Sequence, residues 1–134
     1  MGVAMVMYRT VILEAHDGSR WRSLSQLPTT DQPQLNQHLL WENPSWKPLP
    51  RKPEDFPPLP EDCSERVKSR LKGVAYFVKT CLDFESFERG VEKVASACEE
   101  CHGQALIEMK SAIAMAKVLT EGNIPVRFIV LLDY

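Results

Sequence analysis

The residues Cys98-Glu99-Glu100-Cys101-His102 are the part of this sequence whose types and spacing best suit chemistry. Cys-x-x-Cys-His is the attachment motif of c-type haem, in which two thioether bonds and an axial histidine hold the cofactor. On a helix, Cys98, Cys101 and His102 are three and four residues apart and therefore share one side. Thiolate and imidazole also suit zinc, and Cys63 or Cys81 can supply a fourth ligand.

Cys98 and Cys101 also continue an apolar helical stripe, and burial of both as free thiols is the interpretation that we favour. Structural zinc sites usually carry two ligand pairs, whereas this sequence has one. Haem attachment normally follows export, and residues 1–7 offer no basic or long apolar leader. Glu99-x-x-His102 has the spacing of a di-iron helix but lacks a second such pair. Zinc, haem or thiol-redox chemistry at Cys98, Cys101 and His102 is therefore the alternative prediction.

The chain has 134 residues and a formal net charge of −2, which favours one domain without a general attraction to nucleic acid. Four basic residues cluster in sequence but spread around a helix, which is typical of a solvated face: Arg66, Lys68, Arg70 and Lys72. No run approaches the roughly 20 apolar residues that span a bilayer. We expect a cytoplasmic protein with reduced thiols, bound neither to nucleic acid nor to a membrane.

Residues 28–61 form a proline-rich arm, because nine of the ten prolines lie between Pro28 and Pro60. Each proline fixes φ and removes an N–H group, so we expect extended, largely polyproline II backbone without a helix. Disordered linkers are poor in aromatic residues, whereas this arm is not, so we expect it to dock on its own domain or on a partner. Its stretch from Lys47 to Pro53 also matches the spacing that SH3 domains read. The candidate partner-binding residues are Trp41, Trp46, Pro50, Pro53 and Phe56.

An N-terminal β-hairpin is predicted from the apolar, β-branched segment Val3 to Ala15 and the turn dipeptide Asp17-Gly18, with Ser19 to Leu24 as the return strand. Trp21 offers a packing surface in the second strand. The charged residues expected on the exposed side are Arg9, Glu14 and Arg22.

Helical spacing begins at Asp62, which with Glu65 matches a capping box and predicts a helix ending near Leu82. Residues 84–121 are either one long helix or two helices joined near Gly103, after a cap at Asp83. The pair Gly122-Asn123 then ends the helix, and a last strand follows over 124–132. Its side chains alternate between two apolar faces, with four on one side and two on the other: Val126, Phe128, Val130 and Leu132 against Ile129 and Leu131.

These elements predict an α+β fold over 1–134, with a small antiparallel sheet packed on two or three helices and the arm outside. Since the helices can cover one sheet face, we expect the other to be covered by the arm, a second copy or another protein. No nucleophile elbow, phosphate-binding glycine loop or His-Glu-x-x-His motif is present. The predicted function is non-enzymatic protein binding or assembly through a sheet face and the arm, without a cofactor.

Overall fold

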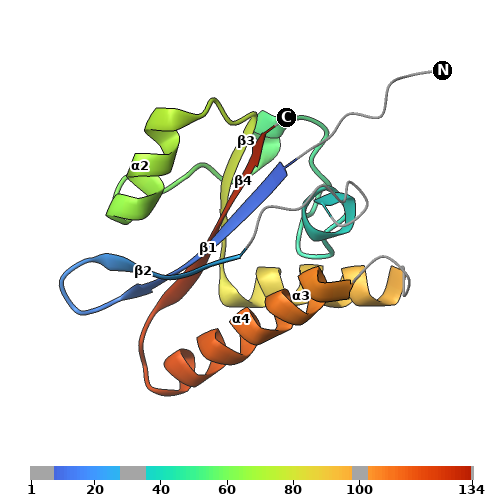
Figure 1. Cartoon of the computed structure of the whole chain (residues 1–134). Coiled ribbons are helices and arrows are strands. Elements are labelled where there is room, and N and C mark those ends of the chain that lie inside the picture. The colour runs from blue at the N-terminus through green and yellow to red at the C-terminus, as the bar shows by residue number, and fades with distance from the viewer. Residues whose placement is uncertain (1–7, 28–35, 98–102, 134) are drawn as a thin grey trace.

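A four-stranded antiparallel sheet forms the centre of the fold. The computed structural model describes residues 8–27, 36–97 and 103–133. The strands are β1 (Tyr8–His16), β2 (Trp21–Leu27), β3 (Val78–Leu82) and β4 (Val126–Asp133). The α-helices are α2 (Glu65–Gly73), α3 (Phe84–Ala97) and α4 (Gly103–Glu121). Strand order is β2-β1-β4-β3, with helices on both sides of the sheet (Figure 1), so the predicted α+β class is confirmed.

β1 and β2 form the expected N-terminal hairpin, but its turn is wider than Asp17-Gly18 predicts. His16 pairs with Trp21, so residues 17–20 connect the strands and β2 starts later than position 19. The Asp17 carboxylate accepts hydrogen bonds from the backbone N–H groups of Ser19 and Arg20, at 2.8 and 2.9 Å. Such side chain–backbone bonds compete with strand pairing, which explains the longer loop.

The two-sided apolar pattern predicted for β4 is confirmed. Phe128, Val130 and Leu132 join one hydrophobic cluster, whereas Ile129 and Leu131 join a second cluster. All five side chains are fully buried. β4 lies between β1 and β3, so it has neighbours on both edges and both faces.

The prediction of one helix from Asp62 to Leu82 is wrong, because the second half of that segment is β3. α2 ends at Gly73, and the chain then returns to the sheet, where Val78 pairs with Leu132 and Leu82 with Phe128. Val78, Thr80 and Leu82 are buried on alternate positions. Strand pairing with β4 therefore overrides the helical spacing of the apolar residues, which is a long-range effect.

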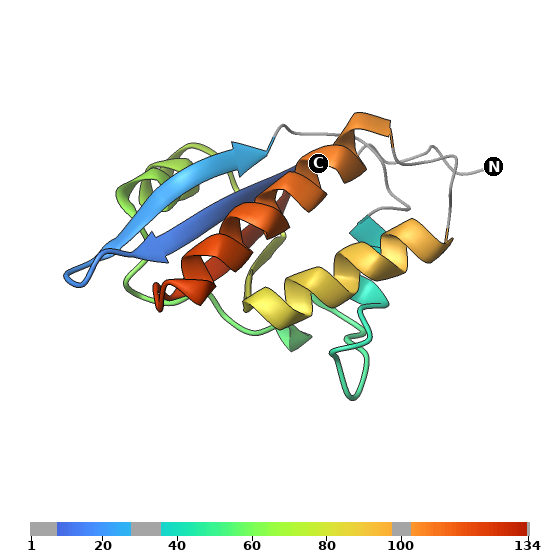
Figure 2. The ribbon, with the colours of Figure 1, turned by 90° about the horizontal axis from the view of Figure 1, so that it is seen from below.

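α3 and α4 are two separate helices that run antiparallel against one face of the sheet (Figure 2). Asp83 accepts a hydrogen bond from the backbone N–H of Ser86 at 2.8 Å, as expected of a cap. α4 ends at Glu121, and Asn123 adopts φ 61°, which confirms the predicted stop. Among the described helices, none combines the length and apolarity that crossing a bilayer requires.

α2 covers the opposite face of the sheet, so the expectation that all the helices share one face is wrong. Val67 and Tyr76 are buried against Ile129 and Leu131 there, with Leu59 at the edge. Because α2 precedes β3, an edge strand, the chain can cross to this face before it enters the sheet. In the described structure, both faces of the central strands are covered by the chain itself.

The arm contains two short helical turns, contrary to the expectation that no helix forms there. A π-helical turn, η1, spans Gln37–Trp41, and a 3₁₀ turn, η2, spans Pro53–Asp55. The sequence between Pro33 and Pro44 is free of proline, which leaves enough N–H groups for η1. η2 starts with proline at its first position, where proline is well tolerated.

Candidate functional site

The aromatic side chains of the arm pack against the molecule's own core. Phe56 is buried, and its ring meets Trp41 edge-on with centroids 4.8 Å apart and Trp46 at 6.2 Å. The indole N–H of Trp46 donates a hydrogen bond to the carbonyl oxygen of Leu40 at 2.6 Å. The structure therefore brings three of the five candidate partner-binding residues together in an intramolecular cluster.

The two prolines of that candidate set lie beside this cluster. Pro50 lines a surface cavity of about 570 Å³ together with Trp46 and Phe56. Pro53 begins η2 and is half-buried. The packed aromatic rings of this set have a structural role within the chain. Recognition of the five residues by a partner stays a prediction.

η1 is held against α3 by a close approach at Gly90. The Asn43 side-chain amide donates hydrogen bonds to the carbonyl oxygens of Leu39 and Ser86, at 2.8 and 2.9 Å. A Cβ atom on Gly90 would lie 2.6 Å from Asn43 Nδ2 and 2.9 Å from the Leu39 carbonyl oxygen. Only glycine at this position lets the arm and α3 approach so closely.

Cys98, Cys101 and His102 lie outside the described residues, so their predicted chemistry stays a prediction. The two cysteines proposed as a fourth zinc ligand are Cys63, before α2, and Cys81, which lies on β3 rather than on a helix. Both pack on the α2 face, whereas α3 and α4, which flank residues 98–102, pack on the opposite face. Cys63 and Cys81 therefore lie on the other face of the sheet from α3 and α4.

The two described thiols are poor nucleophiles. Burial raises the pKa of Cys81 to about 11 and also raises the pKa of Cys63. A thiol reacts through its thiolate, which such environments suppress near neutral pH. Over residues 8–27, 36–97 and 103–133, no group of three or more His, Cys, Asp or Glu side chains is arranged to hold a metal ion.

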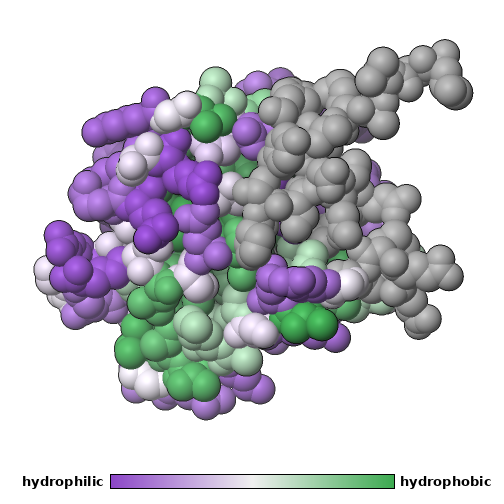
Figure 3. All heavy atoms as spheres, in the orientation of Figure 1, coloured by the Kyte–Doolittle hydropathy of each residue, from purple (hydrophilic) through white to green (hydrophobic). Residues whose placement is uncertain are grey.

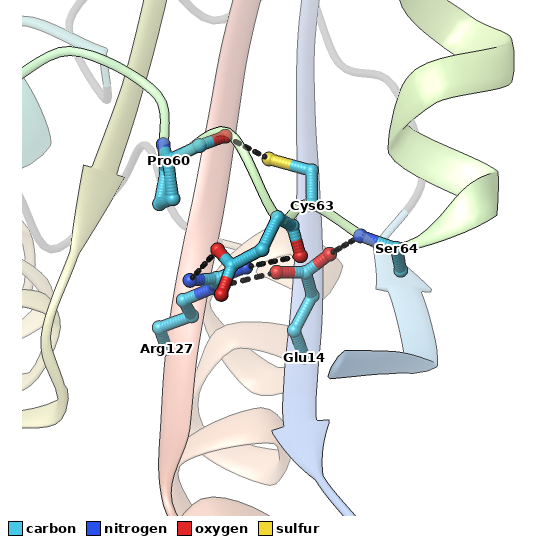
Figure 4. A network of polar contacts seen from close by, with 6 residues as sticks. Glu14, Pro60, Cys63, Ser64 and Arg127 are labelled. Carbon is cyan, nitrogen blue, oxygen red and sulfur yellow. Dashed lines mark hydrogen bonds and ion pairs between the residues drawn. The ribbon is translucent and has the colours of Figure 1, made fainter. Parts of the chain in front are cut away.

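A buried polar network joins the sheet to the start of α2 (Figure 4). Glu14 is fully buried; its Oε1 accepts a hydrogen bond from Arg127 Nε, and its Oε2 accepts one from the backbone N–H of Ser64, both at 2.7 Å. Arg127 also donates through Nη1 to Asp62 Oδ1 at 3.1 Å and lies 3.9 Å from the Trp21 ring centroid. Hydrogen bonding to Arg127 lowers the pKa of the exposed Asp62 carboxylate.

Two sequence predictions are wrong at this network. Glu14 was expected to be exposed, but it pairs in register with Arg127 on β4 and is covered by the segment before α2. Asp62 was expected to cap the helix, but the N-cap is Ser64, and Asp62 binds Arg127 instead. Glu14 Oε2 joins the start of α2 to the sheet, and Oε1 holds Arg127, which also binds Asp62 before α2. We therefore assign Glu14 a structural role rather than a catalytic one.

Arg9 is a second charged residue of β1 that is buried, contrary to the predicted exposure. It is 2% exposed, and its Nη1 donates a hydrogen bond to Asn36 Oδ1 at 2.7 Å. Burial lowers its pKa to about 10. β1 is an interior strand covered on both faces, and the partners of its charged residues lie far away in sequence, so no local pattern reveals their burial. Arg22, by contrast, is exposed as predicted.

A basic surface cavity of about 380 Å³ lies beside the network. Its cations are partly neutralised, because Arg22 pairs with Asp17 and Lys68 lies 3.6 Å from Glu65. Asp62 and Glu65 line the same cavity and add negative charge. The balance of charges does not favour an anionic ligand strongly enough to assign one.

A groove of about 600 Å³ lies between α3 and α4. We call it the α3–α4 groove. Its apolar lining comes from both helices: Val91 and Ala95 of α3, and Ile113 and Ala114 of α4. Two acidic side chains line it from α3 and two basic side chains from α4: Glu88 and Glu92, and Lys110 and Lys117. Among the described residues, none of these four charges forms an ion pair.

The outer side of α4 extends this apolar surface. Ile107 and Val118 are 66% and 68% exposed, and Met115 is 44% exposed. The opposite side of α4 packs on the core through Ala105, Met109, Ala112 and Ala116. Hydrophobic residues gather over α4 at the lower edge of Figure 3. α4 is therefore apolar on both its buried and its exposed side.

Sequence patterns identified only the buried side of this helix. The helical spacing of four apolar residues predicts one buried stripe: Leu106, Met109, Ile113 and Ala116. Met109 and Ala116 are buried, whereas Leu106 and Ile113 are half-buried. The overlooked signal was the set of apolar residues outside that stripe: Ile107, Met115 and Val118. The chain resembles no family model, curated protein or solved structure in our comparisons, so its function has to be inferred from these surfaces.

Proposed function

We propose that this chain is a non-enzymatic protein-binding and assembly module whose docking surface is the α3–α4 groove. The occupant would be helical, with an apolar stripe for the lining of the groove and charged residues complementary to its two rims. The sequence prediction placed the interface on the proline-rich arm, whose aromatic rings pack on the core, and on a sheet face. The chain's own helices cover that face in the described structure, so we move the proposed interface to the outer surface of the helices.

The two-sided apolar character of α4 is the observation that carries this proposal. A helix at the surface of a globular protein normally has one apolar stripe and a polar opposite side, whereas a helix that is apolar all round is normally buried. α4 exposes Ile107 and Val118 by about two thirds of their surface. A partner that covers this side would remove the exposed apolar surface from water.

The charges along the groove specify the chemistry of the partner. The α3 rim is acidic through Glu88 and Glu92, and the α4 rim is basic through Lys110 and Lys117. A helix seated in such a groove uses apolar anchors three and four residues apart and places its charges at the rims. Complementary rim charges contribute mainly orientation and specificity.

A peptide with the sequence 103–121 tests this proposal, because it carries the outer apolar stripe of α4 and its two lysines. We expect native mass spectrometry of the whole chain with excess peptide to show a one-to-one complex. Ala114→Glu places a charge on the apolar lining and should weaken that complex about tenfold or more, equivalent to about 1.4 kcal/mol. Ala114 is exposed, so this variant should fold.

Ala75→Glu is the matched control, since Ala75 is also exposed but lies between α2 and β3 and does not line the groove. It should bind the peptide like the unchanged chain. Absence of a complex at high micromolar peptide, or equal binding by both variants, would contradict the proposal.

The alternative function is a metal, haem or thiol-redox protein centred on Cys98, Cys101 and His102. It rests on the sequence motif alone. Replacement of Cys98 and Cys101 by alanine should then remove a bound species or a redox response. Native mass spectrometry of protein purified without chelator detects such a species directly.

A further inference from the structure

We infer that the occupant of the α3–α4 groove is the same groove of a second copy, related by a two-fold axis that runs parallel to the two helices. This inference rests on the proposed function, because it names the partner for that docking surface. It is drawn from the arrangement of charge and apolar side chains on one antiparallel helix pair.

The helix pair already sets the axial positions of the charges. α3 and α4 run antiparallel (Figure 2), so the first part of α3 lies beside the last part of α4. Glu88 near the start of α3 and Lys117 near the end of α4 line the same groove from opposite helices. Glu92 lies four residues further along α3, and Lys110 lies seven residues before Lys117 on α4, and both also line the groove.

A two-fold axis parallel to the helices stacks α3 of one copy on α4 of the other without changing these axial positions. The acidic rim of each α3 then faces the basic rim of α4 of the second copy. The interface is isologous, so every such pair occurs twice. Over the part of the chain that the structure describes, these four side chains form no ion pair, and they gain complementary partners in this arrangement.

The other two-fold arrangement that stacks these faces has its axis perpendicular to the helices. That arrangement places α3 on α3 and α4 on α4, so glutamates face glutamates and lysines face lysines. Facing like charges disfavour it. The charge pattern therefore selects the parallel axis.

The apolar residues fit the same arrangement. Ile107, Ala114 and Val118 are seven and four residues apart on α4, which places them on one outward stripe. In the paired form this stripe lies against α3 of the second copy, which removes its exposed apolar surface from water.

Charge reversal on one helix at a time tests this geometry. One variant carries Glu88→Lys and Glu92→Lys, and the other carries Lys110→Glu and Lys117→Glu. Sedimentation equilibrium should show a dimer for the unchanged chain, at least tenfold weaker self-association for each variant alone, and recovery of the dimer when the two are mixed. Glu54→Lys with Glu61→Lys is the control, since both glutamates are exposed and outside the groove.

A perpendicular axis would give a different result, because the mixture would then associate more tightly than the unchanged chain. Equal dimerisation by all variants would also overturn the inference, since the groove charges would then be irrelevant. If the unchanged chain stays monomeric while the peptide 103–121 binds, the second copy is excluded and the docking function stands. If neither associates, both proposals fail.

Discussion

Replacement of Glu14 by glutamine should destabilise the fold strongly, although the two side chains have nearly the same shape. Glu14 is fully buried and accepts hydrogen bonds from two donors, Arg127 Nε and the Ser64 N–H. A glutamine oxygen can accept from one of them, and its NH₂ group then faces the other donor. The guanidinium of Arg127 also loses its buried counter-charge.

The magnitude follows from these contacts. Removal of one partner from a buried ion pair costs about 3–5 kcal/mol. The isosteric change keeps the packing and one of the two hydrogen bonds, so we expect a loss near the lower end, about 3 kcal/mol. For a domain of this size, that loss lowers the melting temperature by about 10 °C.

Urea denaturation followed by circular dichroism measures this loss directly. Asp62→Asn is the matched control, because Asp62 contacts the same arginine but its side chain is 67% exposed. This substitution should therefore lower the free energy of unfolding much less than Glu14→Gln does. Glu14→Gln within about 0.5 kcal/mol of the unchanged chain would refute the assigned role of the network. An equal effect of the two substitutions would refute it as well.

Three further predictions follow from the packing and the cysteines. Gly90→Ala should cost about 1–3 kcal/mol in urea denaturation because the added methyl meets η1, whereas Gly73→Ala, which meets nothing within 4 Å, should not destabilise the fold. Cys81, whose pKa is raised to about 11, should resist alkylation at pH 8 until the chain unfolds, as peptide mapping can check. Native mass spectrometry without chelator should show no mass beyond that of the polypeptide in each copy; zinc or haem that disappears on Cys98→Ala with Cys101→Ala would favour the alternative function.

Much of the fold could be predicted because local patterns and tertiary packing agree over most of the chain. β4 alternates apolar side chains between two faces, and the structure buries them on those two faces. The end of α4 carries a left-handed Asn123, where the sequence has its stop signal. At such positions, the period of the apolar residues and the residues that end a helix are sufficient to predict the structure.

The errors occurred where a distant partner decides the local structure. β3 was predicted as helix, because its apolar spacing suits both elements and only pairing with β4 distinguishes them. Glu14 was predicted as exposed, because its partner Arg127 lies 113 residues away in sequence. Neither outcome has a local signature.

The candidate docking surface was overlooked for a related reason. Helical periodicity identifies one apolar stripe on a helix, which in α4 is the buried one, and leaves the other apolar residues of the helix outside the pattern. The structure shows that Ile107 and Val118 lie on the exposed side. The groove charges become informative only once α3 and α4 are known to be antiparallel neighbours.

Sedimentation equilibrium of the unchanged chain and of the two charge-reversed variants, alone and mixed, tests the proposed assembly most directly. We predict a dimer for the unchanged chain, weak self-association of each variant alone, and recovery in the mixture. A chain that stays monomeric at every concentration, or that dimerises equally in all variants, would contradict pairing through the α3–α4 groove.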